Sequence, residues 1–420
     1  MVSAATDTTP WNQSADQSAA APELRLIAAC IAAVVAGQAG RCEAVLEAGE
    51  PDWILFLTLA LNHNVAGIVA VALTSLPEGR VPKAVLATLA MHRRHTGERN
   101  RAALDEQRRV LDALDAAGIP GVPLKGAWLC LRAYRDLSVR PSRDLDFLVP
   151  AACVAPALPV LERCGYDVAT GLSARQLQAT IRDDCEFMFT RPDRRFVIEP
   201  HWAYVPRNLL LGIDMGGIWQ RLRPMTVDGQ TYRTLSPEDE LILLCLHGGK
   251  EEWARLKWLA DLAAFVTASP GLDWSTVAER AHREGVRRPV GLAVVLLHQV
   301  FALRTGLLEQ SMRDPAIPRL AAMLLRRIEV AAAARNVGTA AAVHEVSRIR
   351  LMLLDRRLDR MRYVVRTLTT PRRIHFTLVP LPDRLHPLYV MVKLGIDNVL
   401  HPIWLIIKRL LRRIGTPAGR

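Results

Sequence analysis

Residues 140–149 read Arg-Pro-Ser-Arg-Asp-Leu-Asp-Phe-Leu-Val, and the tripeptide Leu124-Lys125-Gly126 precedes them. Within this stretch acidic and apolar side chains alternate, which predicts a β-strand. In such a strand Asp144 and Asp146 project from one face while the apolar residues point into the core. Two carboxylates on one face repel each other, so the pattern favours a divalent cation between them.

Acidic residues separated by one position occur at four places in the chain, about as often as chance predicts for its acid content. The pairs at 50–52, 184–186 and 238–240 lie at a proline break, at the entry to a strand and at the start of a helix. Only Asp144 and Asp146 combine apolar interleaving with an upstream Lys-Gly turn. The flanking sequence therefore favours this pair as metal ligands, against the alternative of a solvated strand face.

A third acid, Glu199, ends the apolar run Phe196-Val197-Ile198, which forms a predicted hairpin with a strand over 186–190. If this strand lies beside the first, three carboxylates meet. Such a set can hold two Mg²⁺ ions about 3.5 to 4 Å apart, an arrangement that supports phosphoryl transfer. The alternative for Glu199 is a charge on an edge strand.

Basic and glycine residues near these acids suggest phosphate binding. At Lys125-Gly126 the glycine lets the backbone approach a phosphate, and the lysine supplies positive charge. Arg140 and Arg143 offer guanidinium groups that either clamp phosphates or pair with acids on the surface. A simple turn remains the alternative for Lys125-Gly126.

These motifs resemble the nucleotidyltransferase superfamily of the polymerase-β kind, and within it a group described only as nucleotidyltransferase family proteins. The shared pattern is Leu-Lys-Gly, a short helix that ends at Tyr134, and Arg-Pro-x-x-Asp-x-Asp-x-Leu-Val at 140–149. An acid-x-His-Trp element matches 199–202. The further matches are Asp52-Trp53, His63, His247, Trp253, Lys257-Trp258 and Asp261. The resemblance runs from about residue 23 into the C-terminal tail.

The resemblance implies an α+β fold, with a small polymerase-β-like nucleotidyltransferase core that has a mixed sheet and is flanked by N- and C-terminal helical lobes. It implies a metal-dependent enzyme that moves a nucleoside monophosphate from an NTP to a hydroxyl of an unknown small-molecule or peptide acceptor, with release of pyrophosphate. The cofactor would be Mg²⁺ or Mn²⁺.

Three sets of site residues follow from the motifs and the resemblance. The catalytic and metal-binding set comprises Asp144, Asp146 and Glu199. The nucleotide-binding set comprises Lys125, Gly126, Arg140, Ser142 and Arg143. The suggested acceptor-contacting set comprises His201, Trp202, His247, Lys250 and Lys257, for which packing and helix pairing are the alternatives.

Periodicity and turn signals predict five segments along the chain. A helix N-terminus is predicted at Ser236, because Pro237 and two acids follow it. The segments are a disordered tail at 1–22, an N-terminal helical lobe at 23–105, the nucleotidyltransferase core at 106–233, a helical lobe at 234–345 and a basic amphipathic region at 346–420.

The positive charge of the chain is concentrated at its end. The formal net charge is +12, and residues 341–420 hold 16 Lys or Arg against five Asp or Glu. The near-neutral remainder disfavours a nucleic-acid partner. The basic region could contact a membrane surface, a nucleic acid or the acids of a partner, or form a solvated rim. Seven cysteines without a CxxC pair, and no evident signal peptide, predict a cytoplasmic protein that could lie peripherally at a membrane.

The main alternative function is a catalytically inactive nucleotidyltransferase-fold scaffold or binding protein, which could contact a membrane surface through the basic region. A nucleic-acid end-modifier is a further alternative. Two departures from the superfamily pattern bear on activity. Ala127 follows Gly126 where a small polar residue is common, and Pro200 removes a backbone donor beside Glu199.

Overall fold

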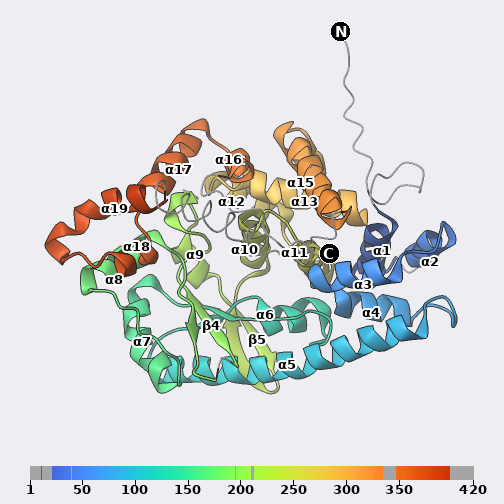
Figure 1. The fold of residues 1–420 in the computed structure, drawn as a ribbon, viewed down its shortest axis with the longest axis horizontal. Helices are drawn as coiled ribbons and strands as arrows, with labels where there is room; N and C mark the ends of the chain where they lie inside the picture. The colour runs from blue at the N-terminus through green and yellow to red at the C-terminus, as the bar shows by residue number, and fades with distance from the viewer. Residues whose placement is uncertain are drawn as a thin grey trace, which may run out of the picture.

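The computed structural model describes residue 11 and residues 21–38, 40–193, 195–209, 212–333 and 347–397. Helices surround a small mixed sheet, so the α+β class is as predicted (Figure 1). The predicted tail at 1–22 lies almost wholly outside the described residues.

The four-stranded sheet brings together strands that are far apart in the chain. It consists of β1 (Val122–Pro123), β2 (Leu145–Leu148), β4 (Val197–His201) and β3 (Phe189–Thr190), in that spatial order. The central strands β2 and β4 are parallel, whereas both outer strands are antiparallel to their neighbours. The predicted strand after Asp144 and the predicted hairpin that ends near Glu199 are therefore both present.

A second, two-stranded sheet was not predicted. It is a hairpin of β5 (Arg223–Val227) and β6 (Gln230–Thr234). Its turn is Asp228-Gly229, and both residues have positive φ angles, of 49° and 81°. An Asp-Gly pair at a two-residue turn is a common hairpin signal, so the sequence did carry the information.

The N-terminal part is helical as predicted, and its last helix is long. The 34-residue helix α5 runs along one side of the molecule and continues across the boundary expected at 105/106 (Figure 1). This helix therefore belongs to the N-terminal helices and also packs against the four-stranded sheet. The helices are α1 (Pro22–Ala36), α2 (Gly40–Glu47), α3 (Trp53–Asn62), α4 (Ala66–Thr74) and α5 (Lys83–Ala116).

The sheet strands are joined by short helices. The predicted helix after Gly126 is an α-helical turn followed by a π-helical turn. The elements are α6 (Gly126–Leu129), η2 (Cys130–Tyr134), η3 (Ala151–Cys153), α7 (Val154–Arg163), α8 (Ala174–Asp183), η4 (Arg207–Leu209) and α9 (Met215–Gln220).

The predicted helix start at Ser236 is confirmed. The Ser236 side chain accepts a hydrogen bond from the Asp239 N–H at 3.1 Å, and Pro237 is the first helical residue. The helices of this part are α10 (Pro237–Lys250), α11 (Leu256–Ala268), α12 (Trp274–Arg283), α13 (Arg287–Phe301), α14 (Leu308–Met312) and α15 (Ala316–Ala333).

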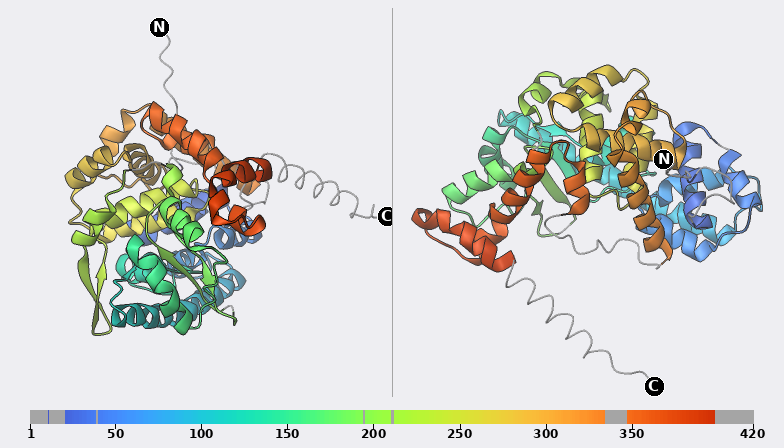
Figure 2. Two further views of the ribbon diagram at one scale, coloured as in Figure 1. Left: turned by 90° about the vertical axis from the view of Figure 1, so that its left-hand side faces the viewer. Right: turned by 90° about the horizontal axis from the view of Figure 1, so that it is seen from above.

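The described part of the basic C-terminal region is helical (Figure 2), and its elements at residues 373–378 and 383–388 contact α8. None of the described helices is both long enough and apolar enough to cross a membrane. Residues 398–420 of the predicted basic region lie outside the described residues. The elements are α16 (Arg348–Leu353), α17 (Arg357–Thr369), α18 (Arg373–Leu378), η5 (Asp383–Leu388) and α19 (Tyr389–Gly395).

Two hydrophobic cores lie on the two faces of the four-stranded sheet. Leu145 and Phe147 are buried with residues of α5 and α7 in the smaller core. Leu148 belongs to the larger core, which α1, α3 and α4 share with helices α10–α15. Because side chains alternate along a strand, Asp146 faces the same side as Leu148, toward the larger core. The cores thus determine which face of the sheet carries the acids.

Candidate metal and phosphate site

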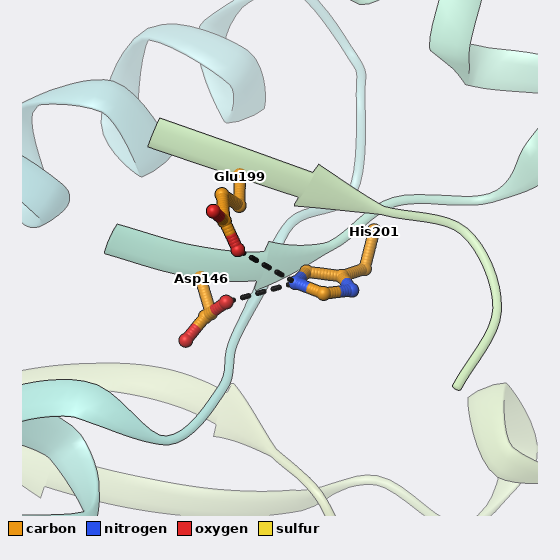
Figure 3. A group of neighbouring side chains, drawn as sticks. All are labelled: Asp146, Glu199 and His201. Atoms are coloured by element: carbon orange, nitrogen blue, oxygen red, sulfur yellow. Dashed lines mark hydrogen bonds and ion pairs between the residues drawn. The ribbon is translucent and has the colours of Figure 1, made fainter. Parts of the chain in front are cut away.

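The parallel pairing of β2 and β4 brings two acids together. Asp146 is the register partner of Glu199, and Leu148 is the partner of His201. Because Glu199 and His201 lie two positions apart on one strand, they share a face with Asp146. One ligand atom from each of these three residues lies within 4.8 Å of the other two (Figure 3). This three-residue group is called the metal group below.

Asp146 is buried beside a lysine and a histidine. Its Oδ1 lies 3.3 Å from the Lys125 Nζ and 2.8 Å from the His201 Nε2. Its backbone carbonyl accepts a hydrogen bond from the Gln107 side chain at 2.6 Å. Burial alone would raise the pKa of Asp146, but Lys125 and His201 together hold that pKa well below the usual range. Asp146 is therefore a fixed, ionised carboxylate.

Glu199 is in a different electrostatic environment. Burial first, and then the negative charges of Asp146 and Asp144, raise the pKa of Glu199 to about 8. Its Oε2 lies 3.9 Å from the His201 Nε2. Without an added cation, keeping both carboxylates ionised thus costs free energy. A divalent ion between them would reduce the repulsion.

The ring nitrogen of His201 that faces away from Asp146 contacts a residue that sequence reasoning missed. The His201 Nδ1 lies 3.1 Å from the Glu186 Oε2, and the Lys250 Nζ donates to the Glu186 Oε1 at 2.9 Å. This arrangement directs the Nε2 of His201 toward Asp146 and Glu199. The signal was present in the predicted hairpin, because the register that pairs Phe189 with Ile198 also places Glu186 opposite His201.

The Lys125-Gly126 turn packs directly beside the acidic strand. Lys125 and Gly126 have φ angles of 40° and 51°, a region that strongly favours glycine. A Cβ at Gly126 would lie 3.1 Å from the Ser142 Oγ, and that hydroxyl donates to the Asp144 carbonyl at 3.1 Å. The turn and the start of β2 are therefore packed as one unit. Its contact with a phosphate stays a prediction.

Arg140 is not exposed in the structure. Its Nε donates to the Asp261 Oδ1 at 2.8 Å, and both side chains are about 95% buried or more. Its Nη1 also donates to the Gly126 carbonyl at 3.4 Å, and the Tyr134 hydroxyl reaches Asp261 as well. Arg140 therefore links the glycine turn to α11, and any contact with a phosphate remains a prediction.

Asp144 and Arg143 precede β2 and are more accessible. Asp144 is half-buried and lies outside the metal group, although its charge acts on Glu199. Arg143 is exposed. Asp144 ends the irregular segment before the strand, so the alternation that fixes Asp146 does not fix its side chain in the same way. Its role as a ligand stays a prediction.

Helices α10 and α11 cover the acidic face of the sheet. Burial, and then the charge of Lys125, lower the pKa of His247 well below its ordinary value. Burial, and then Arg140, lower the pKa of Lys257 to about 8. Trp202 instead packs against Phe187 in the smaller core and donates to the Ile181 carbonyl at 2.7 Å. Trp202 thus packs in the core, whereas His247 and Lys257 lie near the acids, and the contact of all three with an acceptor stays a prediction.

The donor set fits a divalent metal ion. Two carboxylates and an imidazole nitrogen are ordinary ligands of Mn²⁺ and of other first-row ions, whereas Mg²⁺ prefers oxygen ligands alone. Glu186 on the far nitrogen of His201 is the outer-shell carboxylate that metal-binding histidines commonly have. The group could therefore hold a divalent cation.

Comparison with known proteins adds one finding. The model of a family described as uncharacterised nucleotidyltransferase matches residues 49–302. The matched range includes the sheet, the metal group and helices α10–α13, and it ends before the basic C-terminal region. No curated protein matches the chain significantly.

Proposed function

Because the chain belongs to this family of uncharacterised nucleotidyltransferases, we propose that it transfers a nucleoside monophosphate from an NTP to a hydroxyl of an acceptor molecule. In this reaction the hydroxyl oxygen forms a bond to the α-phosphorus, and the bond between that phosphorus and pyrophosphate breaks. The small mixed sheet would then be a polymerase-β-like core.

The observation that carries the proposal is the convergence of Asp146, Glu199 and His201 beside the Lys125-Gly126 turn. Acids on neighbouring strands next to a glycine turn are what a metal-dependent phosphoryl transfer needs, since the metal ligands and the phosphate must adjoin. A purely structural cluster would not require two carboxylates in register on one face.

Asp146, Glu199 and the Nε2 of His201 would hold the metal, with Asp144 as a further ligand from the end of the preceding loop. When bound, a divalent cation supplies charge neutralisation at the phosphates and lowers the pKa of the acceptor hydroxyl. Mg²⁺ and Mn²⁺ are the candidates.

The other residues act on the nucleotide phosphates. Lys125 and the backbone of Gly126 would bind them from the turn, and the exposed Arg143 would supply a further positive charge. Lys257 on α11 would contribute a positive charge, although burial lowers its pKa to about 8. These groups orient the phosphate chain in line with the acceptor hydroxyl, which is the main source of rate in this chemistry.

The direct test is transfer from an NTP labelled at the α-phosphate, with Mg²⁺ or Mn²⁺ and a small-molecule extract as the acceptor source. Asp146→Asn should reduce the transfer by at least about a hundredfold, because it removes a charged ligand. Glu309→Gln, at a side chain that is 77% exposed on α14, is the control and should transfer normally. Absence of transfer by the wild-type protein to any acceptor would remove most support for the proposal.

One contact favours the scaffold alternative. The Lys125 ammonium already lies 3.3 Å from Asp146, so part of the charge that a metal would supply is present without one. Thermal unfolding separates the two functions, because a ligand that binds the folded state raises Tm. An NTP with Mn²⁺ should raise Tm in the wild type and not in Asp146→Asn; no shift in either protein would favour the scaffold.

A further inference from the structure

A cavity of about 310 Å³ lies between the core and the basic C-terminal helices. Its walls come from α8 and η4 on one side and from α16, α17 and the start of α18 on the other, with the end of α10 at the base. In Figure 1 these C-terminal helices lie above α8, on the side of the molecule away from α1–α4. A volume of this size suits a small organic molecule.

The cavity wall carries more positive than negative charge. Five basic side chains line it, Lys250, Arg350, Arg366, Arg372 and Arg373. The lining acids are Asp183 and Asp184. Asp183 is paired with Arg182 at 2.6 Å, and burial raises the pKa of Asp184. The electrostatic potential inside the cavity is therefore positive, which favours an anionic ligand.

Two arginines of this cavity, Arg350 and Arg366, keep donors for a ligand. Arg350 donates to the Lys250 carbonyl at 2.9 Å, and Arg366 to the Arg207 carbonyl at 3.4 Å. Within the described part of the chain, no carboxylate pairs with either guanidinium. A guanidinium has five N–H groups, and a carbonyl does not neutralise its charge. Both arginines are thus held in place with charge and donors unused.

A chain of contacts joins the cavity to the metal group. Lys250 lines the cavity and donates to Glu186, and Glu186 contacts the Nδ1 of His201. The Nε2 of His201 in turn lies 2.8 Å from Asp146. A ligand in the cavity would therefore lie on the Lys250 side of the candidate catalytic acids.

We propose that this cavity is a binding site for a phosphate monoester that also carries a hydroxyl, and that this molecule is the acceptor. Arg350 and Arg366 bind the phosphate of this molecule. The assignment as acceptor rests on the proposed function, whereas the phosphate site does not. The C-terminal helices then complete the acceptor site.

The test measures binding without metal or NTP, by calorimetry with sn-glycerol 3-phosphate and with glycerol as the uncharged comparison. The wild type and Asp146→Asn should bind the phosphate ester equally and should not bind glycerol. Arg366→Met, which keeps most of the apolar stem, should weaken binding at least about tenfold, since a charge-assisted hydrogen bond is lost. Unchanged binding in this variant, or no binding by the wild type at millimolar ester, would overturn the proposal.

Arg362→Met is the matched control. Arg362 lies one turn before Arg366 on α17, is 57% exposed and does not line the cavity. Its replacement should leave ester binding unchanged, and an equal loss in both variants would show a general charge effect that contradicts the site. If Arg366→Met unfolds, Arg350→Met and Arg366→Lys test the same contact, with loss expected in the first and partial binding in the second.

A lipid headgroup carries the same phosphate chemistry, so vesicles form a separate arm. Phosphatidylcholine vesicles with phosphatidic acid are compared with vesicles of phosphatidylcholine alone. Binding of the soluble ester without vesicle binding assigns the site to a soluble acceptor. Vesicle binding that needs Arg366, without binding of the soluble ester, overturns the proposal and assigns the cavity to a lipid headgroup. Because NTP transfer is measured separately, failure of either proposal leaves the other testable.

Discussion

Asp146 and Glu199 are register partners on the parallel strands β2 and β4. Partners on neighbouring strands lie about 5 Å apart and point to the same side, so their carboxylates share one small volume. Lys125 and His201 stabilise the charge of Asp146, whereas burial and the repulsion from Asp146 raise the pKa of Glu199. One member of the pair is fixed as an anion, and the other holds its proton near neutral pH.

The first prediction concerns the stability of the metal-free protein. The folded-state pKa of Glu199 is about 8, against about 4.5 in an unfolded chain. The folded state therefore binds more protons between these pH values, and this stabilisation is complete below pH 4.5 and is lost as pH rises through 8. We expect a loss of a few kcal/mol, measured by urea unfolding in EDTA.

Glu199→Gln provides the comparison for that measurement, because its amide is neutral at every pH. Its stability should fall less than that of the wild type between pH 4.5 and pH 8. Identical slopes for the two proteins would show that Glu199 does not retain a proton in the folded state.

The second prediction concerns Glu186, which positions His201 through the Nδ1 nitrogen. Glu186→Ala should weaken Mn²⁺ binding by about 10- to 100-fold, as is usual when the outer-shell partner of a histidine ligand is removed. Glu186→Gln should lose less, because its amide oxygen can still accept from Nδ1. Calorimetry with Mn²⁺ checks both, and full affinity in Glu186→Ala would contradict this positioning role.

The third prediction concerns the buried ion pair of Arg140 and Asp261. Arg140→Met leaves Asp261 as a buried charge without its main partner, so we expect a loss of about 3 to 5 kcal/mol in the free energy of unfolding. Arg304→Met serves as the control, since its ion pair with Glu309 is more than 70% exposed on both sides. That control should lose less than about 1 kcal/mol. Equal losses in the two variants would be inconsistent with a buried structural pair.

The fourth prediction concerns His63, a buried imidazole. Burial first, and then Arg255, lower the pKa of His63 to about 4. Its Nδ1 accepts from the Leu256 N–H at 3.2 Å, and its Nε2 is buried without a partner among the described residues. Protonation is thus unfavourable in the folded state, and stability should fall by up to about 3 kcal/mol as pH decreases from 6.5 to 4.

His63→Gln should remove most of this fall in stability between pH 6.5 and pH 4, whatever its effect on stability at neutral pH. His282→Gln, at an exposed position of α12, is the control and should keep the slope of the wild type. Unfolding curves at several pH values measure both, and a wild-type slope in His63→Gln would contradict the assignment.

The fifth prediction concerns Lys257 and depends on the proposed transfer. Its pKa of about 8 means that its charge is lost above that pH. KM for the NTP should therefore rise above pH 8 in the wild type. In Lys257→Arg the charge persists and KM should stay flat, and Lys257→Met should have a raised KM at every pH. A pH profile of KM that is the same in the wild type and in Lys257→Arg would exclude this role.

Much of the fold could be predicted because its signals are local. The strand at Asp146 follows from alternation, the hairpin before Glu199 from two β-rich runs around a turn, and the helix start from Ser236 and Pro237. The Asp228-Gly229 hairpin was equally local and was overlooked. The single helix across residue 105 was overlooked, although no proline or glycine interrupts the chain there.

The site itself could be predicted only in part. Asp146, Glu199, Lys125 and His201 come together as expected from their motifs, although His201 was assigned to the acceptor. Arg140 has a buried partner 121 positions away, which no local pattern indicates. Glu186 was dismissed as a strand-entry acid, because its importance depends on which residue lies opposite it.

The amino-acid sequence by itself determined the elements that bear the acids, since periodicity, turns and caps depend on residues within a few positions of each other. The tertiary structure decided that β2 and β4 pair in parallel with Asp146 beside Glu199, and that Lys250 connects this group to the basic cavity. Those contacts join residues more than 50 positions apart. They depend on strand register and helix packing. The burial of the two cores selects that register and packing, and no local sequence pattern does so.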